Sequence, residues 1–139
     1  MNIMMYSSLV EGWSKGVLDR TRSMRALQEV ARLSVAKYGD GASLSLGLVG
    51  TGAFANEPVY RSPRELREDV AIARAAGVRD LCLFDLGGVT RRPHSGTWLD
   101  AFADDETRAP PFASSPRSVE ALRWISRIAT SSVRFFGSP

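Results

Sequence analysis

The sequence predicts an α/β fold with a parallel sheet of about three strands joined by crossover helices. Apolar runs alternate with amphipathic segments in the order β-α-β-α-β-α-α. The run DLCLFDL, residues 80–86, has the unbroken apolar centre of a strand buried on both faces, which is typical of parallel sheets. The predicted turns from helix to strand are short and those from strand to helix are long, as in repeated βα units.

The first half of the chain supplies two strands and one helix. Residues 2–10, NIMMYSSLV, have no helical stripe and predict a strand. A helix capped by Asp19 is expected to run to about Tyr38, because its apolar residues recur at 3.6-residue spacing. Glycines in GDG, residues 39–41, end it, and SLSLGLV, residues 43–49, predicts the second strand.

The clearest helix start follows a loop at residues 50–62. Ser62 stands at the expected N-cap, Pro63 at the first helical position and Glu65 three residues after the cap, which is the pattern of a capping box. This helix is expected to end at Gly77, ahead of the third strand at 80–86.

The rest of the chain is expected to be helical or connecting. A loop at 87–97 precedes a short helix that Thr97 and Asp100 cap and that ends near Ala103. Polar and proline residues follow, and then a long apolar pattern. We therefore expect three parts: a βα-repeat domain at 1–103, a connector at 104–115 and a C-terminal amphipathic helix at 116–139 that packs on the domain.

The apolar arc of the last segment is wider than a surface helix normally has. More than half of its circumference is covered by apolar residues, namely Val119, Leu122, Ile125, Ile128, Ala129, Val133 and Phe136. This width predicts contact with further repeats or with another subunit, so a homo-oligomer through the C-terminal helix is one expectation.

Composition excludes several classes of partner. The 139 residues, 44% hydrophobic and 24% charged, suit one globular domain. Net charge is +3, but basic and acidic residues alternate, as in RSPRELRED, so we expect no nucleic-acid partner. No apolar stretch approaches the ~20 residues that span a bilayer, and the start makes a poor signal peptide. We therefore expect no membrane partner and a cytoplasmic location.

Cysteine and histidine usage argues against a metal centre. Cys82 and His94 are the only residues of their types, too few for the usual four zinc ligands. Cys82 lies inside the run LCLF and is expected to be a small buried residue. We expect neither a metal nor a cofactor.

The glycine loop GTGAFA is the main cofactor candidate. Gly50, Gly52 and Ala55 resemble the Rossmann dinucleotide fingerprint after a predicted strand. The fingerprint requires a helix that starts at the loop, whereas Pro58 follows at once and the next helix waits until Ser62. We interpret these glycines as a sharp turn that keeps a cavity open.

Active sites of parallel α/β sheets form at the carboxyl ends of the strands. Three carboxylates are predicted there: Glu11 after the first strand, Glu57 in the second βα loop and Asp85 at the end of the third strand. They would share one edge of the sheet, with unequal burial separating their pKa values.

The stretch YRSPRELREDVAIARAAGVRDLCLFDLGGV resembles a βα repeat of a TIM barrel, and more loosely the late repeats of glycoside hydrolases. The likeness covers roughly residues 1–103. A complete barrel has eight strands and typically ~250 residues, so the resemblance implies a partial, terminal portion of a barrel. The alternative is a small open three-layer sheet.

That resemblance implies a carbohydrate-processing hydrolase with a sugar or other small-molecule substrate. Glycoside cleavage needs two carboxyl groups, so Glu11 would be the acid/base and Asp85 its partner, with Glu57 in reserve. Expected substrate-binding residues are Trp13 and Tyr60, which offer flat faces to a sugar ring, and Arg91 and His94, which could bind an anionic group. Each also has a plainer interpretation: Glu11 solvated, Asp85 bonded to backbone N–H groups of the glycine turn, His94 simply exposed.

A second resemblance concerns LCLFDLGGV, which looks like the first motif of the haloacid dehalogenase superfamily. It would make Asp85 a nucleophile. Gly87 stands where the phosphatase branch has a second acid, and no lysine follows Lys37. A non-catalytic remnant or interaction module is the remaining alternative.

Overall fold

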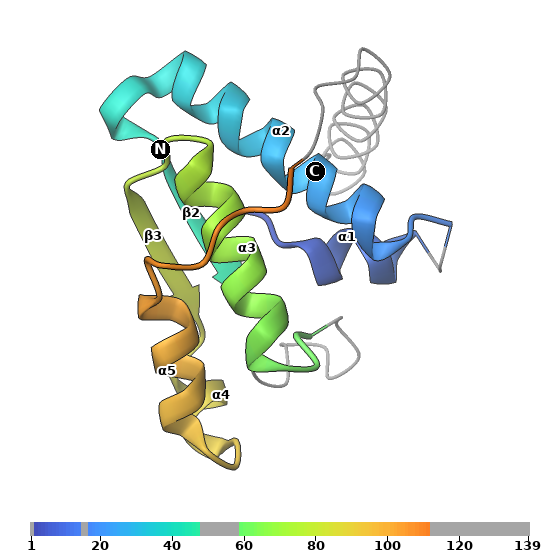
Figure 1. The fold of residues 1–139 in the computed structure, drawn as a ribbon, viewed down its shortest axis with the longest axis vertical. Coiled ribbons are helices and arrows are strands. Elements are labelled where there is room, and N and C mark those ends of the chain that lie inside the picture. The colour runs from blue at the N-terminus through green and yellow to red at the C-terminus, as the bar shows by residue number, and fades with distance from the viewer. Residues whose placement is uncertain (1, 15–16, 48–58, 112–139) are drawn as a thin grey trace, which may run out of the picture.

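The computed structural model describes residues 2–14, 17–47 and 59–111, with Trp13 as backbone only. They form an open α/β sheet of three parallel strands in the order β1-β2-β3 (Figure 1). The strands are β1, Asn2–Met4, β2, Ser43–Gly47, and β3, Asp80–Phe84. The parallel α/β class that the sequence predicts is therefore confirmed.

Helix α2, Arg20–Tyr38, begins and ends where the sequence predicts. The Asp19 side chain caps it, because Oδ1 accepts a hydrogen bond from the Arg22 N–H at 2.8 Å. Gly39 ends it with a φ of 54°, in the left-handed region that favours glycine.

Helix α3, Pro63–Ala75, also begins at the predicted residue, but its cap differs. The Ser62 side chain makes no capping hydrogen bond. Glu65 Oε2 instead accepts from the Arg61 N–H at 2.8 Å, one residue before the N-cap. The chain then turns into β3 at Gly77, where φ is 98°.

Two stretches expected to be extended or irregular are helical. The predicted strand at 2–10 ends at Met4, and α1, Ser7–Trp13, follows. Helix α4, Leu86–Arg91, and the start of α5, Ser95–Ala103, occupy most of the predicted loop at 87–97. Asp85 causes the first of these two helices to begin directly after β3, because its side chain caps it.

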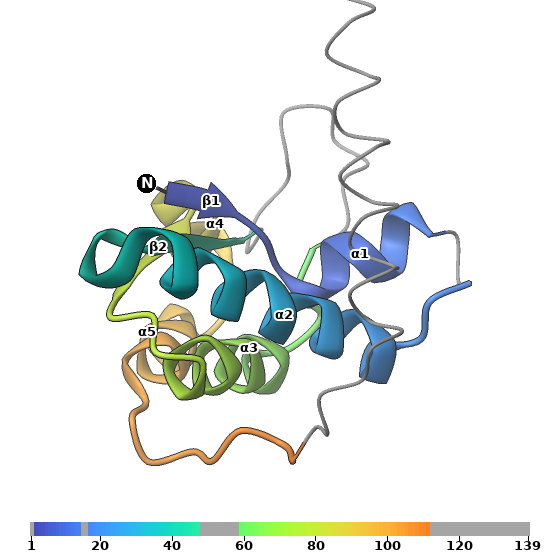
Figure 2. The same ribbon diagram turned by 90° about the horizontal axis from the view of Figure 1, so that it is seen from above.

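Helices α2, α3 and α5 lie on one side of the sheet (Figures 1 and 2). The strand residues facing them form the core, and Leu44 and Leu46 of β2 are completely buried. The described residues leave the opposite face largely uncovered at the outer strands, where Met4 and Phe84 are 50% and 47% exposed. The expectation that β3 is buried on both faces is therefore wrong.

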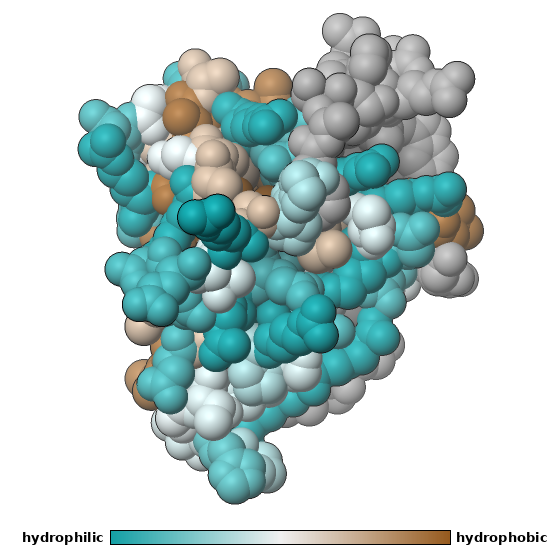
Figure 3. Space-filling view, in the orientation of Figure 1, coloured by the Kyte–Doolittle hydropathy of each residue, from teal (hydrophilic) through white to brown (hydrophobic). Residues whose placement is uncertain are grey.

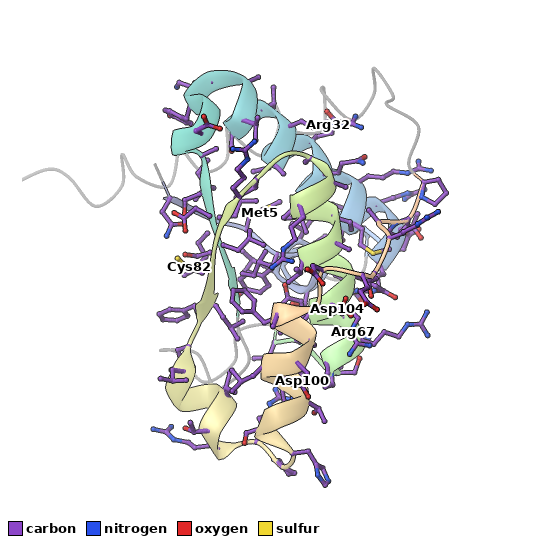
Figure 4. The ribbon with its side chains drawn as sticks, turned by 60° about the vertical axis from the view of Figure 1, so that its left-hand side comes forward. Met5, Arg32, Arg67, Cys82, Asp100 and Asp104 are labelled. Atoms are coloured by element: carbon purple, nitrogen blue, oxygen red, sulfur yellow. The ribbon has the colours of Figure 1, made fainter. Side chains whose placement is uncertain are left out.

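Cys82 lies on this uncovered face and is exposed, contrary to the expectation of a buried thiol. Figure 4 shows it on the side of β3 away from α3 and α5.

No helix of the described residues is long and apolar enough to cross a membrane.

The surface over α3, α5 and the following connector is mainly hydrophilic (Figure 3). Arg67 on α3 forms an ion pair with Asp104, with 2.7 Å between Nε and Oδ2, and the two side chains lie together in Figure 4. This contact fixes the start of the predicted connector, of which 104–111 are described. The predicted C-terminal helix at 116–139 lies outside the described residues.

Candidate functional site

The carboxyl edge of the sheet is where α1 follows β1 and α4 follows β3. Because the strands are parallel, the segments that follow β1 and β3 leave from the same edge. The segment that follows β2 is not described between 48 and 58, so the glycine loop and Glu57 lie outside the described residues.

Glu11 lies on α1 and contacts Arg61, which precedes α3. Glu11 Oε1 accepts from the Arg61 guanidinium, and this bond raises the pKa of Arg61. Oε2 is buried and has no hydrogen-bond partner among the described residues. The carboxylate is therefore shielded but keeps one oxygen uncommitted, unlike the solvated side chain of the plainer interpretation.

Asp85 is the N-cap of α4. Its Oδ1 accepts a hydrogen bond from the Gly88 N–H at 2.8 Å, which is the backbone bond that the plainer interpretation expects. A Cβ built on Gly87 would lie 3.5 Å from Asp85 Oδ2 and 3.9 Å from an Arg91 Nη2 atom. Asp85 and Arg91 therefore flank the same small glycine position.

Tyr60 is fully buried and offers no face to a ligand in this conformation. Its hydroxyl donates to Asp69 Oδ2 at 2.8 Å, and its ring centroid lies 5.7 Å from that of Tyr6. Burial, followed by the nearby Asp69 charge, raises the pKa of Tyr60 well above its usual value. Tyr60 is therefore a buried hydrogen-bond donor to Asp69.

Of the other predicted binding residues, two are exposed and one has no described side chain. Arg91 is the last residue of α4 and is exposed. His94 is exposed too, and it stands at the N-cap of α5 with a φ of 56°. Trp13 ends α1, and its side chain lies outside the described part of the chain. Glu11 contacts Arg61 and Asp85 contacts Gly88, so neither hydrogen bond joins the two carboxylates.

The sequence analysis missed a buried acid, Asp69 on α3, that is central to this edge. Asp69 has no exposed surface. Its Oδ2 accepts from the Ser7 N–H at 2.7 Å and from the Tyr60 hydroxyl at 2.8 Å, while Oδ1 has no partner among the described residues. Burial raises the pKa of Asp69 to about 6, although the Ser7 and Tyr60 bonds and the Arg20 charge oppose the rise.

Arg20, at the start of α2, joins this acid to a surface ion-pair network. Its Nη1 donates to Ser7 Oγ at 3.1 Å and its Nη2 lies 2.6 Å from Glu68 Oε2. Arg64 also pairs with Glu68 at 2.9 Å. Burial alone would raise the pKa of Glu68, but the bonds to the two arginines lower it below its usual value.

One sequence signal could have located Asp69. The apolar stripe of α3 contains Leu66, Val70 and Ala73, all completely buried, and Asp69 falls within it. An acid on the buried face of an amphipathic helix needs hydrogen-bond partners, so it marks a polar site in the core.

No group of three or more metal-ligating side chains occurs among the described residues. Comparisons with protein-family models, with curated proteins and with solved structures found no match for the chain. The candidate site is therefore defined by its geometry alone. Glu11, Asp85 and Arg91 belong to the carboxyl edge, and the buried Asp69 binds Ser7 of α1 and Tyr60.

Proposed function

We propose that the three strands and their helices are consecutive repeats of a TIM-barrel-like hydrolase that acts on a carbohydrate at the carboxyl edge of the sheet. The observation that carries this proposal is the strand order. Each strand pairs in parallel with its neighbour in the sequence, and α2, α3 and α5 lie on one side. Consecutive barrel repeats have this arrangement, and the uncovered face with Met4 and Phe84 would then face the barrel interior.

In this proposal Glu11 is the acid/base and Asp85 is the partner carboxylate. Glu11 suits the first role because it is shielded and one of its oxygens has no partner among the described residues. Asp85 follows a strand directly and is held in place by its bond to Gly88. Arg91, which flanks Gly87 together with Asp85, would contact an anionic substituent of the sugar. Hydrolysis through two carboxyl groups requires both of them at one edge.

Chromogenic p-nitrophenyl glycosides test the proposal with two isosteric variants, Glu11→Gln and Asp85→Asn. Each should lower kcat roughly 10²–10⁴-fold, the usual contribution of a catalytic acid or base. Asn caps helices about as well as Asp, so Asp85→Asn removes the charge and keeps the start of α4. Asp80→Asn is the matched control, because Asp80 is an exposed acid at the other end of β3. Parental rates in both edge variants would exclude these roles.

A haloacid-dehalogenase-like hydrolase is the second candidate, and the position of Asp85 directly after a parallel strand favours it. Hydrolysis of p-nitrophenyl phosphate with Mg²⁺ that disappears in Asp85→Asn, without glycosidase activity, would support this candidate over the first.

A non-catalytic interaction module is the third candidate, and the uncovered sheet face favours it. Light scattering separates a monomer from the homo-oligomer expected through the C-terminal helix. An oligomer that is inactive on every substrate above would support this reading.

A further inference from the structure

We propose that Asp69 is a proton-operated lock that holds α1 against α3. Its single oxygen Oδ2 joins three segments of the chain: α3, which carries Asp69, the start of α1 through the Ser7 N–H, and the segment before α3 through Tyr60. These bonds are 2.7 and 2.8 Å long and lie in the buried interior. The Ser7 bond bridges 62 residues of sequence, so it fixes tertiary structure rather than a local turn.

Helix α1 depends on such tertiary contacts to exist. It has seven residues, far fewer than the ~12–15 that make an isolated helix marginally stable in water. Its N-cap residue, Tyr6, makes no side-chain capping hydrogen bond to the helix, and the first N–H of the helix, that of Ser7, donates to Asp69. Loss of that acceptor would leave a buried donor unsatisfied.

The charges around Asp69 do not fully compensate its carboxylate. Arg20 of α2 approaches it, but the same guanidinium is bound to Glu68 at 2.6 Å. Glu65 and Glu68 of α3 add negative charge near Arg20, and Tyr60 is a neutral donor beside Tyr6. The oxygen Oδ1 has no partner among the described residues, so it can take a proton while Oδ2 continues to accept both hydrogen bonds.

The direction of the pH effect follows from linkage. The pKa of Asp69 is about 6 when it is buried, against an ordinary value of 3.8. Movement of α1 that hydrates Asp69 returns the pKa toward the ordinary value. Docking of α1 is therefore strongest below the ordinary pKa and weakens as pH rises through about 6. The two values limit the change in the opening equilibrium to on the order of 10²-fold.

The lock also affects the position of Glu11 at the carboxyl edge of the sheet, because α1 carries Glu11 one turn after Ser7. Opening of α1 would move Glu11 away from Arg61 and from the carboxyl edge. This consequence rests on the proposed function, whereas the lock itself does not.

Hydrogen exchange of α1 amides between pH 4.5 and 7.5, corrected for the intrinsic exchange rate, tests the lock. In the parent protein, the protection of α1 should fall with rising pH, by 10-fold or more within the limit of ~10²-fold given above. In Asp69→Asn, which keeps one acceptor oxygen and cannot ionise, protection should not vary with pH. Asp100→Asn, an exposed acid on α5, is the control and should behave as the parent.

The carboxyl ¹³C titration of Asp69 in the parent provides a second measurement that needs no variant. A midpoint near 6 that accompanies the change in α1 protection supports the lock. A midpoint near 4, pH-independent protection in the parent, or the same pH dependence in Asp69→Asn would overturn it. Glycosidase activity is no part of this readout, so loss of the proposed function would leave the result interpretable.

Discussion

Substitution of Gly47 by alanine should destabilise the sheet at the end of β2. A Cβ built on Gly47 would lie 2.6 Å from the Phe84 carbonyl oxygen and 3.1 Å from Phe84 Cβ, whereas ordinary contact begins at 3.4 Å. Because the first of these atoms is backbone, no side-chain rotation relieves the overlap. Strands β2 and β3 would have to separate by several tenths of an ångström at the pair Gly47↔Phe84.

Overpacking of this kind typically costs about 1–3 kcal/mol, which corresponds to a fall in Tm of roughly 3–10 °C for a chain of this size. Thermal unfolding followed by far-UV CD measures the change. Gly41→Ala is the matched control: no atom lies within 4 Å of the added Cβ and φ is not in the left-handed region, so its Tm should stay close to the parental value. Equal Tm values for Gly47→Ala and the parent would refute the close approach of the two strands.

Two further predictions concern the ends and faces of β3. Asp85→Ala should lower the free energy of unfolding by ~0.5–2 kcal/mol through loss of the α4 cap, while Asp85→Asn should change it little. Urea denaturation measures both free energies, and equal losses in the two variants would contradict the capping role. Cys82 is exposed and is the only cysteine, so one thiol per chain should react with Ellman's reagent without denaturant. Reaction only after unfolding would show that the β3 face is covered in solution.

The sequence located elements whose signals are local. Helix α2 begins after Asp19 and α3 after Ser62 because capping residues and apolar spacing lie within a few positions of each other. Even there, the expected capping bond was replaced, since Glu65 binds the Arg61 N–H instead.

Failures occurred where distant residues decide the structure. Helix α1 begins at Ser7 with its first N–H bound to Asp69, and no pattern within residues 2–10 encodes that contact. The apolar run around Cys82 predicted burial on two faces, because a strand pattern does not show which face the helices will cover.

The candidate site was predicted only in part. Parallel strands allowed the carboxyl edge to be named in advance, and Glu11 and Asp85 follow strands there. Tyr60 was expected to face a ligand, yet it is buried and its hydroxyl donates to Asp69, the acid that the sequence analysis missed.

The sequential order of the sheet has a consequence for how such a chain can lengthen. Each strand pairs with the one before it, and among the described residues the outer edges of β1 and β3 have no further strand. A duplicated strand-helix segment could therefore join at either margin without separating an existing pair. Growth by tandem gene duplication would preserve every interior contact already formed.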